Sequence, residues 1–216
     1  MQPRSLYLTL SILFCQIFCN QLYAQVFTTV KLTKANLPKF IKFKGKIIDA
    51  VHYVDSLGEN IVLRSETGIY QSKADTDNGT NSADLFAYHY ILKEDTALLL
   101  WRVTDFIKEC ELDITANFIE GAFFITDLDK DGTSEVWLVY QTSCRGDVSP
   151  NTMKVIMYEG QKKFAMKGER KIKVSPTEVL GGKYIFDAAF LKADAVFRDY
   201  AKKLWKKHEL NVDEPL

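Results

Sequence analysis

The sequence predicts a mainly β protein of the α+β class, with about eight antiparallel strands in two four-stranded units and a C-terminal amphipathic helix packed on a sheet. Three observations support this prediction. Apolar and polar residues alternate with a period of two through most of the chain, and clusters of turn-forming residues separate the alternating runs. Near the C-terminus the apolar period lengthens to that of a helix.

Residues 1–24 have the pattern of a secretory signal peptide. Arg4 precedes the apolar run SLYLTLSILFCQIFC, and the tripeptide LYA stands before Gln25. A retained anchor is the alternative, but this run of 15 residues is shorter than the roughly 20 that a membrane-spanning helix needs. We therefore expect export to the periplasm, cell surface or extracellular space, with no transmembrane segment after cleavage.

The charges of the chain are balanced. It has 28 basic and 28 acidic residues, and signal cleavage removes only one of them, Arg4. A balanced composition lacks the positive charge that binding to a phosphate backbone requires, so we expect no nucleic-acid partner.

Cys110 and Cys144 are the cysteines that remain after cleavage. In an oxidising compartment two cysteines allow one intramolecular bridge, so we predict a disulfide between them. The alternative is a pair of reduced, buried thiols.

The alternating runs pair into four hairpins within a β-rich domain of residues 25–180. In chain order the predicted strands are residues 46–54, 60–66, 84–92, 97–107, 118–126, 135–143, 152–159 and 162–170. Each half combines a long hairpin, a polar loop and a second hairpin, which suggests a duplication of residues 44–108 and 118–171. Chance similarity between hairpins is the alternative.

A helix is predicted over residues 183–209, directly after Gly181 and Gly182. Its apolar residues recur at spacings of three and four and would form one stripe against a sheet. They are Phe186, Phe190, Ala193, Phe197, Tyr200 and Leu204. Aspartates lie early in this segment and lysines late, as the helix dipole favours.

The run DLDKDGTSE between the fifth and sixth predicted strands has the composition of a calcium loop. Its predicted ligands are the side chains of Asp127, Asp129, Asp131 and Glu135 and the carbonyl oxygen of Thr133. The loop is not an EF-hand, because the position of the EF-hand's bidentate glutamate is occupied by Leu138. The alternative is a turn whose aspartates accept hydrogen bonds from backbone amides without a metal.

The pattern D-x-D-x-D-G-x-x-E resembles the calcium-binding turns of FG-GAP and related repeats. Residues 100–160, with DLDKDGTSEVWLVY followed by CRGDVSP, resemble a family of small exported Bacteroidota proteins labelled as surface polysaccharide biosynthesis proteins. This resemblance implies an envelope role, with a glycan or an envelope protein as partner, and supplies no catalytic residue. It also points to O-glycosylation at Ser56 and Thr96, whose tripeptides DSL and DTA are similar to the signal of that group.

The sequence favours a binding function over an enzymatic one. It contains no G-x-S-x-G, H-E-x-x-H or P-loop motif. We therefore predict a secreted, envelope-associated binding or accessory module that is stabilised by calcium. The alternative is a carbohydrate-active hydrolase that uses a carboxylate pair from Asp105, Glu109, Glu111 or Asp147.

Overall fold

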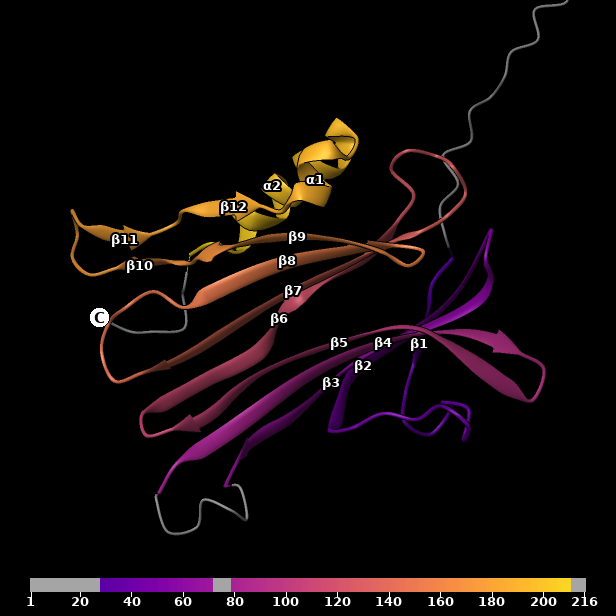
Figure 1. Cartoon of the computed structure of the whole chain (residues 1–216), viewed down its shortest axis with the longest axis horizontal. Coiled ribbons are helices and arrows are strands. Elements are labelled where there is room, and N and C mark those ends of the chain that lie inside the picture. Colours follow the sequence, from indigo (N-terminus) through magenta and orange to yellow (C-terminus); the bar gives the residue numbers. More distant parts are fainter. Residues whose placement is uncertain (1–27, 72–78, 211–216) are drawn as a thin grey trace, which may run out of the picture.

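Two antiparallel sheets of five strands face each other in the structure, a computed structural model that describes residues 28–71 and 79–210 (Figure 1). The predicted signal peptide lies outside the described residues. The first sheet has the order β1-β2-β3-β4-β5, and the second has the order β12-β9-β8-β7-β6.

The strands follow the alternating runs of the sequence. The first sheet consists of β1 (Val30–Leu32), β2 (Lys46–Asp55), β3 (Gly58–Tyr70), β4 (Asn81–Lys93) and β5 (Thr96–Cys110). The second consists of β6 (Asp113–Thr126), β7 (Glu135–Arg145), β8 (Thr152–Glu159), β9 (Lys162–Glu169) and β12 (Tyr184–Phe186), while β10 (Lys171–Lys173) and β11 (Val179–Gly181) form a small separate ribbon. All eight predicted strands are confirmed, as β2 to β9.

The main core lies between the facing sheets. Val62 and Leu85 of the first sheet and Leu138 of the second are completely buried in the same cluster. Trp101 of β5 stacks on Tyr158 of β8 with 4.2 Å between ring centroids. The inward residues of each strand are therefore those that the period of two marks as apolar.

The outer face of the second sheet is covered by helices, as predicted (Figure 1). Trp137 and Phe164 of the sheet are fully buried against Phe190, Phe197 and Trp205. These contacts belong to the helices α1 (Ala188–Lys192) and α2 (Ala195–His208).

The prediction of one continuous helix over residues 183–209 is wrong in two respects: Tyr184–Phe186 is strand β12, and the helix is interrupted. Ala193 and Asp194 have extended backbones between α1 and α2. The guanidinium of Arg198 donates to the carbonyls of Phe190 and Ala193, which supplies partners for the end of α1. The apolar residues keep spacings of three and four across the interruption because both helices pack on the same sheet.

The segment between β1 and β2, for which the sequence predicts no strand or helix, packs on the outer face of the first sheet. Ile41 is buried there against Tyr88 and Tyr90. The hydroxyl of Tyr90 donates to the carbonyl of Lys42, and the hydroxyl of Tyr88 accepts from the amide of Lys44 at 3.1 Å. Each sheet therefore has buried residues on both of its faces.

Cys110 and Cys144 form the predicted disulfide, with 5.9 Å between their Cα atoms and a sequence separation of 34. Cys110 is the last residue of β5, and Cys144 lies near the end of β7. The bridge therefore joins the two sheets covalently.

The two sheets share a four-stranded meander but differ in where the extra strand pairs, which is the first meander strand for β1 and the last for β12. Each contains a four-stranded meander, β2 to β5 or β6 to β9, and one short additional edge strand. This arrangement is compatible with the predicted duplication, which stays a prediction. Neither described helix has the length and apolar character that would be needed to cross a membrane.

Candidate functional site

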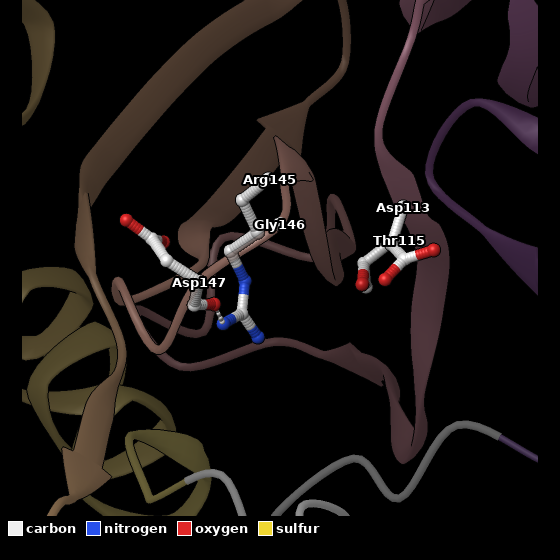
Figure 2. A pocket seen from close by; sticks show the side chains of 5 residues that line it. All are labelled: Asp113, Thr115, Arg145, Gly146 and Asp147. Carbon is white, nitrogen blue, oxygen red and sulfur yellow. Dashed lines mark hydrogen bonds between the residues drawn. The ribbon is translucent and has the colours of Figure 1, made fainter.

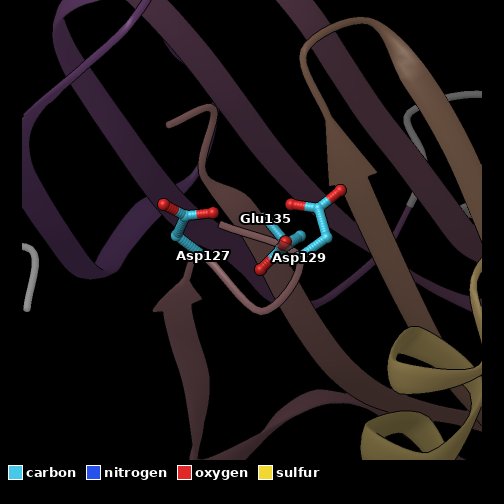
Figure 3. A group of neighbouring side chains, drawn as sticks. All are labelled: Asp127, Asp129 and Glu135. Atoms are coloured by element: carbon cyan, nitrogen blue, oxygen red, sulfur yellow. The ribbon is translucent and has the colours of Figure 1, made fainter. Parts of the chain in front are cut away.

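The acidic turn connects β6 to β7 and brings carboxylates into one cluster (Figure 3). Asp127, Asp129 and Glu135 each place one carboxylate oxygen within 4.8 Å of the others. Asp129 also belongs to a second such group, with Asp131 and Glu159. Five carboxylates thus form two groups that share Asp129, and carboxylate oxygen is the ligand type that calcium prefers.

Glu159 is not among the ligands predicted from the sequence, because it lies outside the turn. It is the last residue of β8 and stands directly opposite Glu135 in the register of β7 and β8. Pairing of the sixth and seventh predicted strands would have found it, since both glutamates lie at strand ends that face the same turn. Like charges in directly opposed positions are unfavourable without compensation.

Glu135 is completely buried at the base of the turn. One of its oxygens accepts from the hydroxyl of Thr126 at 2.5 Å, and the amide of Leu128 lies 3.0 Å from both oxygens. Burial raises the pKa of Glu135 to about 7, the nearby charges of Asp129 and Asp127 add to the increase, and these hydrogen bonds oppose it. A charged Glu135 therefore needs a neighbouring positive charge near neutral pH.

The aspartates differ in their hydrogen bonding. Asp131 accepts from the amide of Thr133 at 2.7 Å, and Asp129 accepts from the amide of Asp131 at 3.3 Å. Hydrogen bonds of this kind are expected if the turn holds no metal. Asp127 is different, because its Oδ1 atom is buried and has no hydrogen-bond partner. Burial, together with the charges of Asp131 and Asp127, also raises the pKa of Asp129.

The acidic turn is fixed to the turn between β2 and β3. The amide of Ser56 donates to the carbonyl of Gly132 at 2.9 Å, and its hydroxyl lies 3.0 Å from that of Thr133. The amide and hydroxyl of Ser134 both donate to one oxygen of Asp55, at 3.0 and 2.7 Å. The corresponding turns of the two meanders therefore meet across the sandwich.

A chain of polar contacts continues from Asp55 into the core. Its second oxygen accepts from the side-chain amide of Asn60 at 2.8 Å, and the Asn60 oxygen lies 2.8 Å from Nε2 of His89. The hydroxyl of Tyr53 lies 3.3 Å from the same nitrogen. Burial lowers the pKa of His89 to about 4, so the imidazole is neutral in the folded protein at neutral pH.

The two residues predicted to carry glycans are accessible. Ser56 is exposed in the turn before β3, and Thr96 is exposed at the start of β5. The hydroxyl of Ser56, however, is already in contact with Thr133. Glycosylation at either position stays a prediction.

A polar hollow of about 270 Å³ lies beside the loop after β7 (Figure 2). Asp113 and Thr115 of β6 face the tripeptide Arg145-Gly146-Asp147 across it. Arg145 donates to the side chain of Asn151 at 2.8 Å and to the carbonyl of Asp147 at 2.6 Å. The guanidinium therefore holds the loop in place.

The four carboxylates considered for hydrolysis do not line one groove. Asp105 forms an ion pair with Lys154 beside an inter-sheet hollow. Asp147 lines the polar hollow of Figure 2 and accepts from the amide of Ser149 at 2.9 Å. Glu109 and Glu111 are exposed and line neither hollow.

No family model, curated protein or solved structure matches this chain.

Proposed function

We propose that this protein is an exported, envelope-associated binding module, linked to surface polysaccharide, whose acidic turn holds a structural calcium ion. Export is supported by the signal-peptide pattern of residues 1–24 and by the disulfide, which an oxidising compartment favours. The polysaccharide link is supported by the resemblance of residues 100–160 described above.

The observation that carries the calcium proposal is the crowding of carboxylate oxygen atoms at the turn. Asp127 has a buried oxygen without a hydrogen-bond partner, and Glu135 is buried beside the charges of Asp127 and Asp129. A divalent cation would supply both the missing partner and the missing positive charge. Without an ion, the cluster keeps its charge repulsion or takes up protons.

The position of the turn gives the ion a structural role. β7 begins with Glu135 in the acidic cluster and carries Cys144 of the disulfide near its other end. The turn also bonds to Ser56 and Asp55 of the opposite sheet. An ion here would stabilise one end of the sandwich while the disulfide stabilises the other.

No observation favours the hydrolase over the binding module. Asp105 is already neutralised by Lys154, and the other proposed carboxylates lie in different places. A retaining or inverting glycosidase needs two carboxyl groups about 5 to 10 Å apart across one groove. We therefore keep the binding module as the proposed function.

Thermal unfolding with calcium and with a chelator tests the proposal. Extracellular modules commonly bind calcium with dissociation constants of about 10⁻⁴ to 10⁻³ M. At ten times the dissociation constant the stabilisation is about 1.4 kcal/mol, which corresponds to an increase in melting temperature of roughly 3 to 6 °C. Asp129→Asn should remove most of this increase and leave the calcium-free protein equally or slightly more stable, because one repelling charge is gone.

Asp113→Asn is the matched control. Asp113 is an exposed aspartate on β6, at the opposite end of that strand from the turn, so its variant should keep the full response to calcium. If the melting temperature of a sample shown to be free of metal is the same with calcium and with chelator, the acidic cluster is a hydrogen-bonded turn and not a calcium site.

A further inference from the structure

A second hollow, of about 400 Å³, lies between the edge of the first sheet and the inner face of the second. The first sheet ends at β5, whose residues 102–105 form one wall. The second sheet continues from β8 to β9, and there Lys163 and Lys167 are exposed. We call this hollow the inter-sheet groove.

The inter-sheet groove is positively charged. Lys167 stands opposite Lys154 in the register of β8 and β9, and Lys163 and Lys167 point to the same face about 13 Å apart along β9. Arg102 adds a cation from β5. The one acidic residue of the lining, Asp105, is paired with Lys154.

Three of these cations carry uncompensated charge. In the described ranges 28–71 and 79–210, Arg102, Lys163 and Lys167 have no salt bridge, and all three are exposed. Lys154 is held in place by Asp105 and keeps about a fifth of its side chain exposed. A row of cations over this length fits an extended polyanion better than a single small anion.

The wall formed by β5 offers hydrogen-bonding groups. Within the described sheet β5 pairs only with β4, so its other edge presents unpaired backbone N–H and C=O groups. These can bond to hydroxyl groups of a ligand. A polyhydroxylated anion therefore matches both walls of the inter-sheet groove.

Addition of a long peptide strand to β5 is disfavoured by two bulges. The register of β4 and β5 shifts between Leu99 and Trp101, and again between Ile107 and Cys110, where Glu109 has a left-handed φ of 50°. Bulges twist an edge strand and interrupt its hydrogen-bond ladder. The stretch of β5 between the two bulges is residues 101–107, so an added strand could pair with this part of the edge for only a short distance without meeting a bulge.

We propose that the inter-sheet groove binds an anionic polysaccharide. Arg102, Lys163 and Lys167 bind its carboxylate or phosphate groups, and the free edge of β5 binds its hydroxyls. The assignment to a glycan rests on the proposed envelope function, whereas the negative charge of the ligand follows from the groove itself. Tyr140 and Tyr158 are nearly buried, so recognition relies on charge and hydrogen bonds and not on stacking of sugars on rings.

Isothermal titration of the purified protein with oligogalacturonate tests this proposal, with a neutral dextran oligomer of similar length and a glutamate-rich peptide as comparison ligands. We expect binding of oligogalacturonate that weakens with added salt, and no binding of dextran. Lys163→Gln/Lys167→Gln should weaken the binding about tenfold or more, because two charged contacts are lost. Both lysines are exposed, so this variant should keep the wild-type melting temperature.

Lys192→Gln/Lys203→Gln is the matched control. It removes the same charge from exposed positions of α1 and α2, on the other face of the second sheet, and should bind as the wild type does. Equal loss in both double variants, or unchanged binding in Lys163→Gln/Lys167→Gln, would overturn the assignment to this groove.

The remaining outcomes separate this inference from the proposed function. Failure to bind oligogalacturonate, together with an intact calcium-dependent increase in melting temperature, would overturn the ligand class and leave the calcium-stabilised module standing. Binding of the glutamate-rich peptide as tight as that of the oligosaccharide would overturn the glycan assignment. Oligosaccharide binding with no response to calcium would support the groove and contradict the calcium site.

Discussion

At the scale of single residues, the acidic turn combines side chains that are close together in the sequence with one that comes from another strand. Asp127, Asp129 and Asp131 are recognisable because alternate aspartates before a glycine are typical of a cation loop. Glu159 joins them only because β7 and β8 pair with Glu135 opposite Glu159. Its contribution can be measured separately.

Glu159→Gln should weaken calcium binding by about tenfold, because calcium affinity depends on the number of charged ligands. Titration calorimetry of the purified protein measures this change. Glu111→Gln, which alters an exposed glutamate away from the turn, should bind calcium as the wild type does. Wild-type affinity in Glu159→Gln would mean that the ligand set does not extend to β8.

His89 should make the protein sensitive to acid. Its pKa falls from 6.5 to about 4 on folding, so the unfolded chain binds the proton more tightly. The stability that the neutral imidazole contributes is present above about pH 6.5 and is lost as the pH falls towards 4, by on the order of 3 kcal/mol. The groups that face the ring are the Tyr53 hydroxyl, Asn60 and Trp101, and the charge of Asp55 partly offsets the shift.

Chemical denaturation of the wild type and His89→Gln between pH 4 and 7 measures this effect. The wild type should lose more stability than the variant over this range, since glutamine does not titrate. The other titrating groups, Glu135 included, are common to both proteins and cancel in the difference. Parallel pH profiles would show that His89 is not the source of the acid sensitivity.

At the scale of elements, α1 and α2 begin with aspartates that differ in their bonding. Asp187 accepts from the amide of Phe190 at 2.8 Å and, through its other oxygen, from the amide of Ala165 in β9 at 2.9 Å. Asp194 precedes α2 but makes no capping hydrogen bond. The first aspartate therefore ties a helix to the sheet, and the second does not.

Asp187→Ala should lower the unfolding free energy by about 1 to 2 kcal/mol, since it removes a helix cap and a bond to β9. The corresponding decrease in melting temperature is roughly 2 to 8 °C for a chain of this size. Asp194→Ala, the same substitution at the next helix start, should change the melting temperature little. Equal decreases in the two variants would contradict the role assigned to the Asp187 side chain.

At the scale of the whole molecule, the disulfide is a covalent cross-link between the two sheets, in addition to the backbone that leads from β5 to β6. It closes a loop with a sequence separation of 34 between β5 and β7. Loop-closure entropy predicts that a bridge of this span stabilises the folded state by about 3 to 4 kcal/mol. This contribution is independent of the calcium proposal.

Cys110→Ala/Cys144→Ala should therefore melt roughly 10 °C below the oxidised wild type. Reductant should lower the melting temperature of the wild type by a similar amount and leave the double variant unchanged. Intact mass should show the gain of two hydrogen atoms in the wild type alone. A wild type that gains no mass on reduction would contradict the bridge.

The eight long strands, the disulfide and the position of the acidic turn were predictable from the sequence alone. Period-two alternation between turn residues located β2 to β9, because one face of each strand must be apolar to form the core. The apolar periodicity gave a wrong prediction in the C-terminal segment, where packing on the second sheet determines the structure. The apolar stripe from Phe186 to Leu204 spans a strand and two helices, because all three pack on the second sheet.

Contacts between side chains from distant segments depend on how the sheets are ordered and packed. Glu159 lies near the acidic turn because of the register of β7 and β8. Ser56 and Asp55 contact the turn because the two sheets face each other. The inter-sheet groove exists because the first sheet ends at β5 while the second continues to β9, which brings Arg102 near Lys163 and Lys167. A sequence pattern records the neighbours of a residue along its own strand, whereas sheet order and sheet packing depend on contacts over the whole chain.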